Sequence, residues 1–308
     1  MHRRKGLEVH QRNPRISWVI PIIPRDTVYF EGLLEGIKKQ SIPPFEVVIV
    51  ASGFSRLQLN PLRLAVSQSP LPIRLVKRRL LRSAAPNRNL GIKRATGDFV
   101  SFFDADDIPH PLRNELLLKA IRERGSASRK LAIFHGYEFL PRDLWNPSKR
   151  DMPETFTRRA PEKLAVATNL AEKTQKRLDD LALQPPRKRV YTLFAFSDAE
   201  FDPTHGHMTV SRSLLNQVEF PNRPLKRDED AVFANLLYLK TKPKFLMIDF
   251  PLTVYRNGWQ DELKAQKDLE WRYPNQLHRF AKSRLEKSSL FLKRFRRRVI
   301  RTINRISK

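Results

Sequence analysis

The chain has 308 residues, 40% of them hydrophobic, so it is long enough to form one large α/β domain or two smaller ones with a sizeable core. It carries 59 Lys and Arg against 32 Asp and Glu, a net charge of +27, which indicates an anionic partner such as nucleic acid, acidic lipid or a phosphorylated ligand. The absence of cysteine excludes disulfides and thiolate metal sites and favours a reducing compartment such as the cytoplasm.

No segment of the sequence has the pattern of a membrane span or a signal peptide. Apolar runs such as 18–23 are far shorter than the roughly 20 residues that cross a bilayer. Residues 1–14 are polar and basic, and no apolar core or cleavage site follows them. We therefore expect a loose basic tail at this end of the chain.

The first half of the chain alternates apolar strands with helices. Strands are predicted at 16–23, 46–50 and 73–76, and a helix at 30–37 lies between the first two. Strand, helix and strand at this spacing predict a right-handed parallel crossover. Residues 54–83 are otherwise mixed in character. The pattern indicates an α/β sheet with mostly parallel strands.

Three carboxylates arrive where the next buried strand ends. A helix over 86–95 leads into the strand Phe99–Phe103, and Asp104, Asp106 and Asp107 follow it. Like charges packed together are unfavourable unless a cation neutralises them, so the cluster predicts a divalent metal with an anionic ligand on its other side. The carboxyl ends of strands in open α/β sheets are where ligands bind. The alternative that Asp107 caps a helix stays open.

The second half of the chain is less regular. Residues 141–190 are rich in proline, Lys and Arg around one helical stretch near 162–183, and we interpret them as an insertion or mobile lobe. Glu229-Asp230 begins a predicted helix, where capping and the macrodipole alone favour acidic residues. The other expected elements are a helix through 116–120, a strand near 131–135, a strand at 206–211, a helix at 231–237 and a strand at 245–250.

The C-terminal residues 282–308 predict a basic amphipathic helix. They contain 11 Lys or Arg and one Glu, and their apolar residues recur at helical spacing. Two alternatives stay open: binding to a membrane surface, or packing on the domain with a solvated basic face.

The run Asn87–Ile92 with Ala95–Asp107 resembles the signature of family 2 glycosyltransferases, "A-R-N-x-G-I … A-x-G-x-y-i-x-f-l-D-x-D-D". Trp18–Pro24 and Gln40–Val50 are also similar to that family, and the resemblance covers residues 16–258. It implies the GT-A (Rossmann-like) fold, an α/β architecture with a mixed, mostly parallel central sheet flanked by helices, and here a basic C-terminal helical tail. The implied parts are a tail at 1–14, the transferase domain at 15–258 with 141–190 as an insertion or acceptor lobe, and a helical extension at 259–308.

The same resemblance implies an inverting, metal-dependent, hexosyltransferase-type enzyme. It transfers a sugar from a nucleotide-diphosphate sugar, a UDP-sugar first among them, to a glycan or lipid-linked acceptor. Mn²⁺ or Mg²⁺ neutralises the diphosphate. We expect a cytoplasmic protein, peripheral at the inner face of the membrane through 282–308, with no specific nucleic acid partner.

The resemblance also assigns roles to residues. Asp106 coordinates the metal, Asp104 contacts the ribose or shares the metal site, and Asp107 supports both. Asp230 resembles the catalytic base, and its neighbour Glu229 contacts the acceptor. The residues expected against the nucleotide sugar are Pro21, Ile23, Arg25, Ser52, Arg78, Arg88, Asp104, Ala105 and Asp106. Of the arginines, Arg88 is expected on phosphate oxygens, with Arg78 or Arg82 as a second. His205 and His207 either reach the metal or diphosphate or are structural.

One departure from the family lies after the second strand. Many relatives carry an acidic "D-D-G-S" there, whereas this chain has Ala51-Ser52-Gly53, so no carboxylate stands at the turn to recognise the base. Two other classes compete with the transferase. One is a non-catalytic basic protein that binds nucleic acid or membrane on a degenerate transferase fold, and the other is a nucleotidyltransferase. The acidic residues at 104, 106 and 230 argue against the first.

Overall fold

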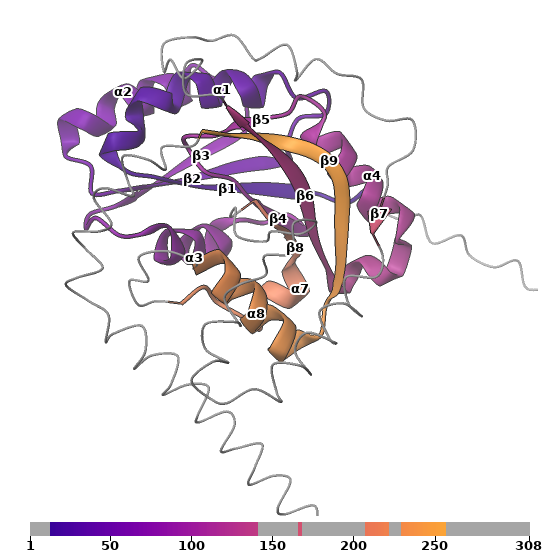
Figure 1. The fold of residues 1–308 in the computed structure, drawn as a ribbon. Helices are drawn as coiled ribbons and strands as arrows, with labels where there is room; N and C mark the ends of the chain where they lie inside the picture. The colour runs from indigo at the N-terminus through magenta and orange to yellow at the C-terminus, as the bar shows by residue number, and fades with distance from the viewer. Residues whose placement is uncertain (1–12, 141–165, 168–206, 222–228, 257–308) are drawn as a thin grey trace, which may run out of the picture. The chain divides into compact units, whose positions relative to one another are not determined.

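The structure is a computed structural model of the chain and describes residues 13–140, 166–167, 207–221 and 229–256 (Figure 1). All of them belong to one compact unit, and the second unit, 177–195 with 258–308, lies outside the described residues. Also outside them are the tail up to residue 12, most of the 141–190 segment, His205 and the amphipathic helix expected at 282–308.

A single mixed sheet runs through the described unit. Its strands are β1 (Ile16–Ile22), β2 (Glu46–Ser52), β3 (Ile73–Arg78), β4 (Phe99–Phe102), β5 (Ile108–Pro109), β6 (Leu131–Leu140), β7 (Val166–Ala167), β8 (Thr209–Ser211) and β9 (Lys244–Arg256). Their order is β3-β2-β1-β4-β8-β6-β9-β5, and β7 pairs with β9 (Figure 1). The first four strands of this order are parallel, as predicted, and β8 lies antiparallel between β4 and β6.

Helices cover both faces of this sheet. They are the 3₁₀ helices η1 (Pro24–Tyr29) and η2 (Gly125–Lys130) and the α-helices α1 (Phe30–Lys38), α2 (Arg56–Ser67), α3 (Ala84–Arg94), α4 (Arg113–Glu123), α7 (Arg212–Leu215) and α8 (Glu229–Thr241). In Figure 1, α1 and α2 lie on one side of the sheet, and α3 and α8 lie on the other. The predicted mixed α/β sheet with flanking helices is therefore confirmed.

Alternating side chains of β1 separate the two layers of the core. Trp18 and Ile20 are fully buried in the cluster that contains residues of α1, α2 and α4. Val19 points to the opposite face, as the period of two in a strand requires. There it meets Gly91 of α3, where an added Cβ would lie 2.2 Å from Val19 Cγ1. Glycine thus lets α3 approach the sheet closely, one helical turn after Arg88.

Three local expectations differ from the structure. The helix α2 lies inside the mixed segment 54–83; its capping box, in which Ser55 and Gln58 exchange hydrogen bonds, was the sequence signal for it. The proposed helix cap at Asp107 is wrong, because β5 follows it and α4 begins only at Arg113. The helix predicted at 162–183 is wrong at Val166–Ala167, which pair with β9 as a strand.

No helix within the described ranges is long and apolar enough to cross a membrane.

Candidate functional site

The carboxyl ends of four parallel strands bring the predicted binding residues to one edge of the sheet. Ser52, the last residue of β2, is in register with Arg78, the last residue of β3. Pro21 stands near the end of β1, and Asp104 follows β4. Such an edge is where open α/β sheets bind ligands. The structure thus groups residues that are up to 83 positions apart in sequence, from Pro21 to Asp104.

Two residues at this edge hold the loop before α3 and the first turn of α3. Ser52 Oγ accepts hydrogen bonds from Asn87 Nδ2 at 2.9 Å and from the backbone N–H of Arg82 at 3.2 Å. Arg78 Nη1 donates to the carbonyl of Pro86 at 2.9 Å. Their contact with a nucleotide stays a prediction, as it does for Pro21, Ile23, Arg25 and the buried Ala105.

Arg88 of α3 joins three carboxylates. Its side chain is 2% exposed, and Nη2 lies 2.6 Å from Asp104 Oδ1, while Nη1 lies 3.1 Å from Glu229 Oε1 and also contacts Asp230 Oδ1. Burial lowers the pKa of Arg88, but the attraction of Asp104, Asp230 and Glu229 outweighs it and raises the pKa above the ordinary value. A permanently charged guanidinium therefore links the loop after β4 to the first turn of α8.

Aromatic packing and one asparagine keep α8 against this arginine. Asn89 Nδ2 donates to the Phe220 carbonyl at 2.9 Å, and the Phe220 N–H donates back to Asn89 Oδ1 at 2.8 Å. The Phe220 ring lies 5.5 Å from the guanidinium of Arg88 and stacks on Phe233 of α8, with ring centroids 3.8 Å apart. Arg88 thus binds the carboxylates, and its neighbour Asn89 anchors Phe220, which packs against α8.

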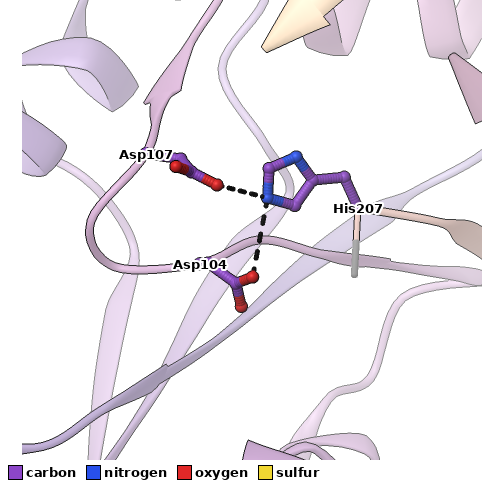
Figure 2. Close-up of side chains that lie close together, drawn as sticks. All are labelled: Asp104, Asp107 and His207. Atoms are coloured by element: carbon purple, nitrogen blue, oxygen red, sulfur yellow. Dashed lines mark ion pairs between the residues drawn. The ribbon is translucent and has the colours of Figure 1, made fainter. Parts of the chain in front are cut away.

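Asp104, Asp107 and His207 form a compact group beside this network (Figure 2). His207 Nε2 lies 2.9 Å from Asp107 Oδ2 and 3.8 Å from Asp104 Oδ2. The other ring nitrogen, Nδ1, is 3.0 Å from Thr253 Oγ1 of β9, which orients the imidazole. One ligand atom from each of the three residues lies within 4.8 Å of the others.

The chemistry of this group fits a divalent cation. Two carboxylate oxygens and one imidazole nitrogen are donors that Mn²⁺ accepts, whereas Mg²⁺ favours oxygen alone. A cation here would also offset the repulsion between carboxylates held close together. Asp104 connects the two parts of the site, because its Oδ1 faces Arg88 and its Oδ2 faces His207.

Two further carboxylates lie nearby. Burial raises the pKa of Asp106 well above its ordinary value, and the charges of Asp107, Asp104 and Asp26 add to the effect. Asp106 is not part of the group formed by Asp104, Asp107 and His207, so its role as a metal ligand stays a prediction. Asp26, in η1 just after β1, was not among the predicted site residues, and its Oδ2 accepts a hydrogen bond from the N–H of Ile23 at 3.1 Å. Its position directly after β1 was the signal that it belongs to this edge.

Comparisons with known proteins agree with this architecture. S. aureus TarS 1–349 in complex with UDP has a TM-score of 0.53 and 18% identity, over 82% of this chain and 63% of that one. The same protein in complex with UDP-GlcNAc has a TM-score of 0.52 and 19% identity, over 79% of this chain and 58% of that one. At this identity the likeness shows the fold, which is GT-A as predicted.

A curated relative from Haemophilus influenzae, named an uncharacterized glycosyltransferase, is 32% identical over 93 residues, 30% of each chain. The chain thus spans less than two thirds of the length of these relatives. Residues 17–170, half of the chain, match glycosyl transferase family 2. The protein belongs to that family.

Proposed function

We propose that the protein transfers a sugar from a nucleoside-diphosphate sugar to a hydroxyl of a glycan or lipid-linked acceptor, with inversion at the anomeric carbon. The observation that carries the proposal is the position of Arg88, which holds Asp104 at the sheet edge and Asp230 at the start of α8 in one network. One side chain thereby joins a carboxylate proposed to bind the donor, Asp104, and the proposed base, Asp230. Family membership supports the same chemistry.

The donor is proposed to bind along the edge formed by β1 to β4. TarS was solved with UDP and with UDP-GlcNAc, which supports a UDP-sugar as the first donor to test. The end of β2 offers the neutral Ser52, which is hydrogen-bonded to Asn87 and Arg82, in place of a carboxylate. Arg78 and Arg25 lie at this edge and are the cations proposed for the phosphates.

Asp104, Asp107 and His207 are the residues that would hold a divalent cation, with Asp106 as a further candidate. When bound, such an ion neutralises the charge that develops on the diphosphate leaving group. The imidazole of His207 favours Mn²⁺ over Mg²⁺.

Asp230 is proposed as the general base. It takes the proton of the acceptor hydroxyl as that oxygen attacks the anomeric carbon and the bond to the diphosphate oxygen breaks. Arg88 stabilises the ionised form of Asp230 by direct contact. Glu229 contacts the same guanidinium nitrogen as Asp230 and is proposed to hydrogen-bond the acceptor instead. The net charge of +27 supports an acceptor beside anionic lipid or polyphosphate, at the cytoplasmic face of a membrane.

A binding experiment tests the donor and metal assignments together. We expect one of UDP, GDP, ADP and dTDP to raise the melting temperature with MnCl₂ and to do so far less with EDTA, since a ligand at 100 times its Kd stabilises by about 2.7 kcal/mol. Asp107→Asn is expected to weaken Mn²⁺ binding at least about tenfold, measured as free Mn²⁺ by electron paramagnetic resonance.

The matched control for this experiment is Asp98→Asn, because Asp98 pairs with Arg15 just before β4, at the opposite end of that strand from Asp104. It should bind Mn²⁺ like the wild type. Asp106→Asn in the same titration decides whether Asp106 is also a ligand. Binding of no nucleoside diphosphate, or unchanged Mn²⁺ affinity in Asp107→Asn, would contradict the assignments.

A further inference from the structure

Arg113, the first residue of α4, is a buried cation whose partners are all neutral. Its side chain is 0% exposed, and no carboxylate among the described residues lies within ion-pair distance of it. Its Nε has no hydrogen-bond partner in the described part of the chain. Burial lowers the pKa of Arg113 to about 9, so the guanidinium stays charged at neutral pH. A buried charge without a counter-charge is unfavourable, so Arg113 is expected to have a function that offsets this cost.

The acceptors of Arg113 lie on the two segments that carry the metal-binding group. Nη1 donates to Ser101 Oγ at 2.8 Å, and Nη2 donates to the carbonyls of Phe102 at 3.3 Å and His207 at 3.0 Å. Phe102 ends β4 two residues before Asp104, and His207 is itself a member of the group. The guanidinium therefore ties the backbone near one candidate ligand to the backbone of another.

Ring packing adds a second connection between Arg113 and His207. The guanidinium lies 5.1 Å from the centroid of Phe103 and 5.0 Å from that of Trp18. The Phe103 ring in turn stacks on the imidazole of His207, with ring centroids 4.7 Å apart and an interplanar angle of 17°. Arg113 thus restrains both the main chain of His207 and, through Phe103, its ring.

We infer that Arg113 is a positioning residue that fixes His207 and thereby sets the affinity of Asp104, Asp107 and His207 for a divalent cation. The inference rests on the metal site proposed above. The planar guanidinium donates from two separate nitrogens, Nη1 to Ser101 and Nη2 to the carbonyls of Phe102 and His207. An ammonium group has all its donors on one nitrogen, and an apolar side chain has none, so neither reproduces this arrangement. Partners that orient a metal ligand change metal affinity by about 10–100-fold when they are removed.

The test compares Arg113→Met and Arg113→Lys with Arg212→Met. Arg212 is also a partly buried arginine that clamps backbone, donating to the carbonyls of Gly97 and Ile92, but it follows β8 at the end away from His207. We expect the Mn²⁺ Kd, measured without nucleotide, to rise about 10–100-fold in Arg113→Met and at least about fivefold in Arg113→Lys. In Arg212→Met the Kd should stay within about twofold while the melting temperature falls.

Two further comparisons distinguish a variant that does not fold from a wrong inference about Arg113. If Arg113→Met does not fold, Arg113→Lys carries the test, because it keeps the charge and most of the volume. In a His207→Asn background, Arg113→Lys should cause no further loss of affinity, since the effect is transmitted through His207; an additive loss would overturn the inference. Wild-type affinity in a folded Arg113→Lys also overturns it. If Asp107→Asn weakens Mn²⁺ binding and the folded Arg113 variants do not, the proposed metal site stands and the role of Arg113 is overturned. If Asp107→Asn does not weaken Mn²⁺ binding, the proposed metal site itself is overturned.

Discussion

Asp230→Asn is expected to lower kcat by about 10²–10⁴-fold, the range that a general base contributes. The amide is nearly isosteric with the carboxylate and still accepts a hydrogen bond from Arg88, so the start of α8 should keep its place. It cannot take a proton from the acceptor. Because Asp230 lies on α8 and not at the strand ends that form the proposed donor edge, the Kd for the donor should change little.

The measurement is steady-state transfer together with donor binding by titration calorimetry. Glu229→Gln is the matched control, because Glu229 precedes Asp230, contacts the same Arg88 Nη1 and loses the same charge. It should raise the KM for the acceptor more than it lowers kcat. A kcat for Asp230→Asn within about tenfold of the wild-type value would remove Asp230 from the role of base.

Arg88→Met should both abolish activity and destabilise the protein by about 3–5 kcal/mol, the cost of leaving buried charges without their partner. Asp104, Glu229 and Asp230 all lose their shared cation in this variant. The measurement is the free energy of unfolding in urea, followed by transfer under conditions in which the variant is folded. Lys93→Met is the control, since Lys93 pairs with Glu219 on the surface and its loss should cost less than about 1 kcal/mol.

The destabilisation by Arg88→Met should depend on pH in a defined direction. In the wild type, burial raises the pKa of Glu229 and Arg88 opposes that effect. Without Arg88, the folded-state pKa of Glu229 rises further above its unfolded value, so the folded variant holds a proton that the unfolded chain releases. Its stability is then greatest at low pH and falls as the pH rises. The free energy of unfolding of Arg88→Met should fall further below that of the wild type at about pH 8 than at about pH 5. A larger loss at about pH 5 would contradict the role of Arg88 as the cation that keeps Glu229 ionised.

Local sequence patterns were enough to predict the sheet edge that carries the site. Continuous apolar runs such as Ile16–Ile22 and Glu46–Ser52 mark strands buried on both faces, and helices between them imply parallel pairing. Once the strands are parallel, their carboxyl ends share one edge, so Asp104 and Ser52 had to lie there. The glycine at position 91 of the family signature is also explained by the structure, because a side chain there would collide with Val19.

The contacts made across the site were beyond sequence analysis. The expected contact of Arg88 with phosphate stays a prediction, but its contacts with Glu229 and Asp230, which are 141 and 142 residues away, were not foreseen. Nothing in the apolar pattern of Thr209–Ser211 says that β8 enters the sheet antiparallel between β4 and β6, and this is what delivers His207 to Asp107. Such placements depend on tertiary packing, which propensity and periodicity do not encode.

The most direct test of the proposed transferase is turnover of a donor. Purified wild-type protein with MnCl₂ and a panel of UDP-, GDP-, ADP- and dTDP-sugars should release the nucleoside diphosphate of one donor class above the rate without enzyme. EDTA and Asp107→Asn should both remove that release, since each takes away the metal that the diphosphate needs. Release that is equally fast with EDTA, or no release from any donor although the protein binds a nucleoside diphosphate, would contradict the account.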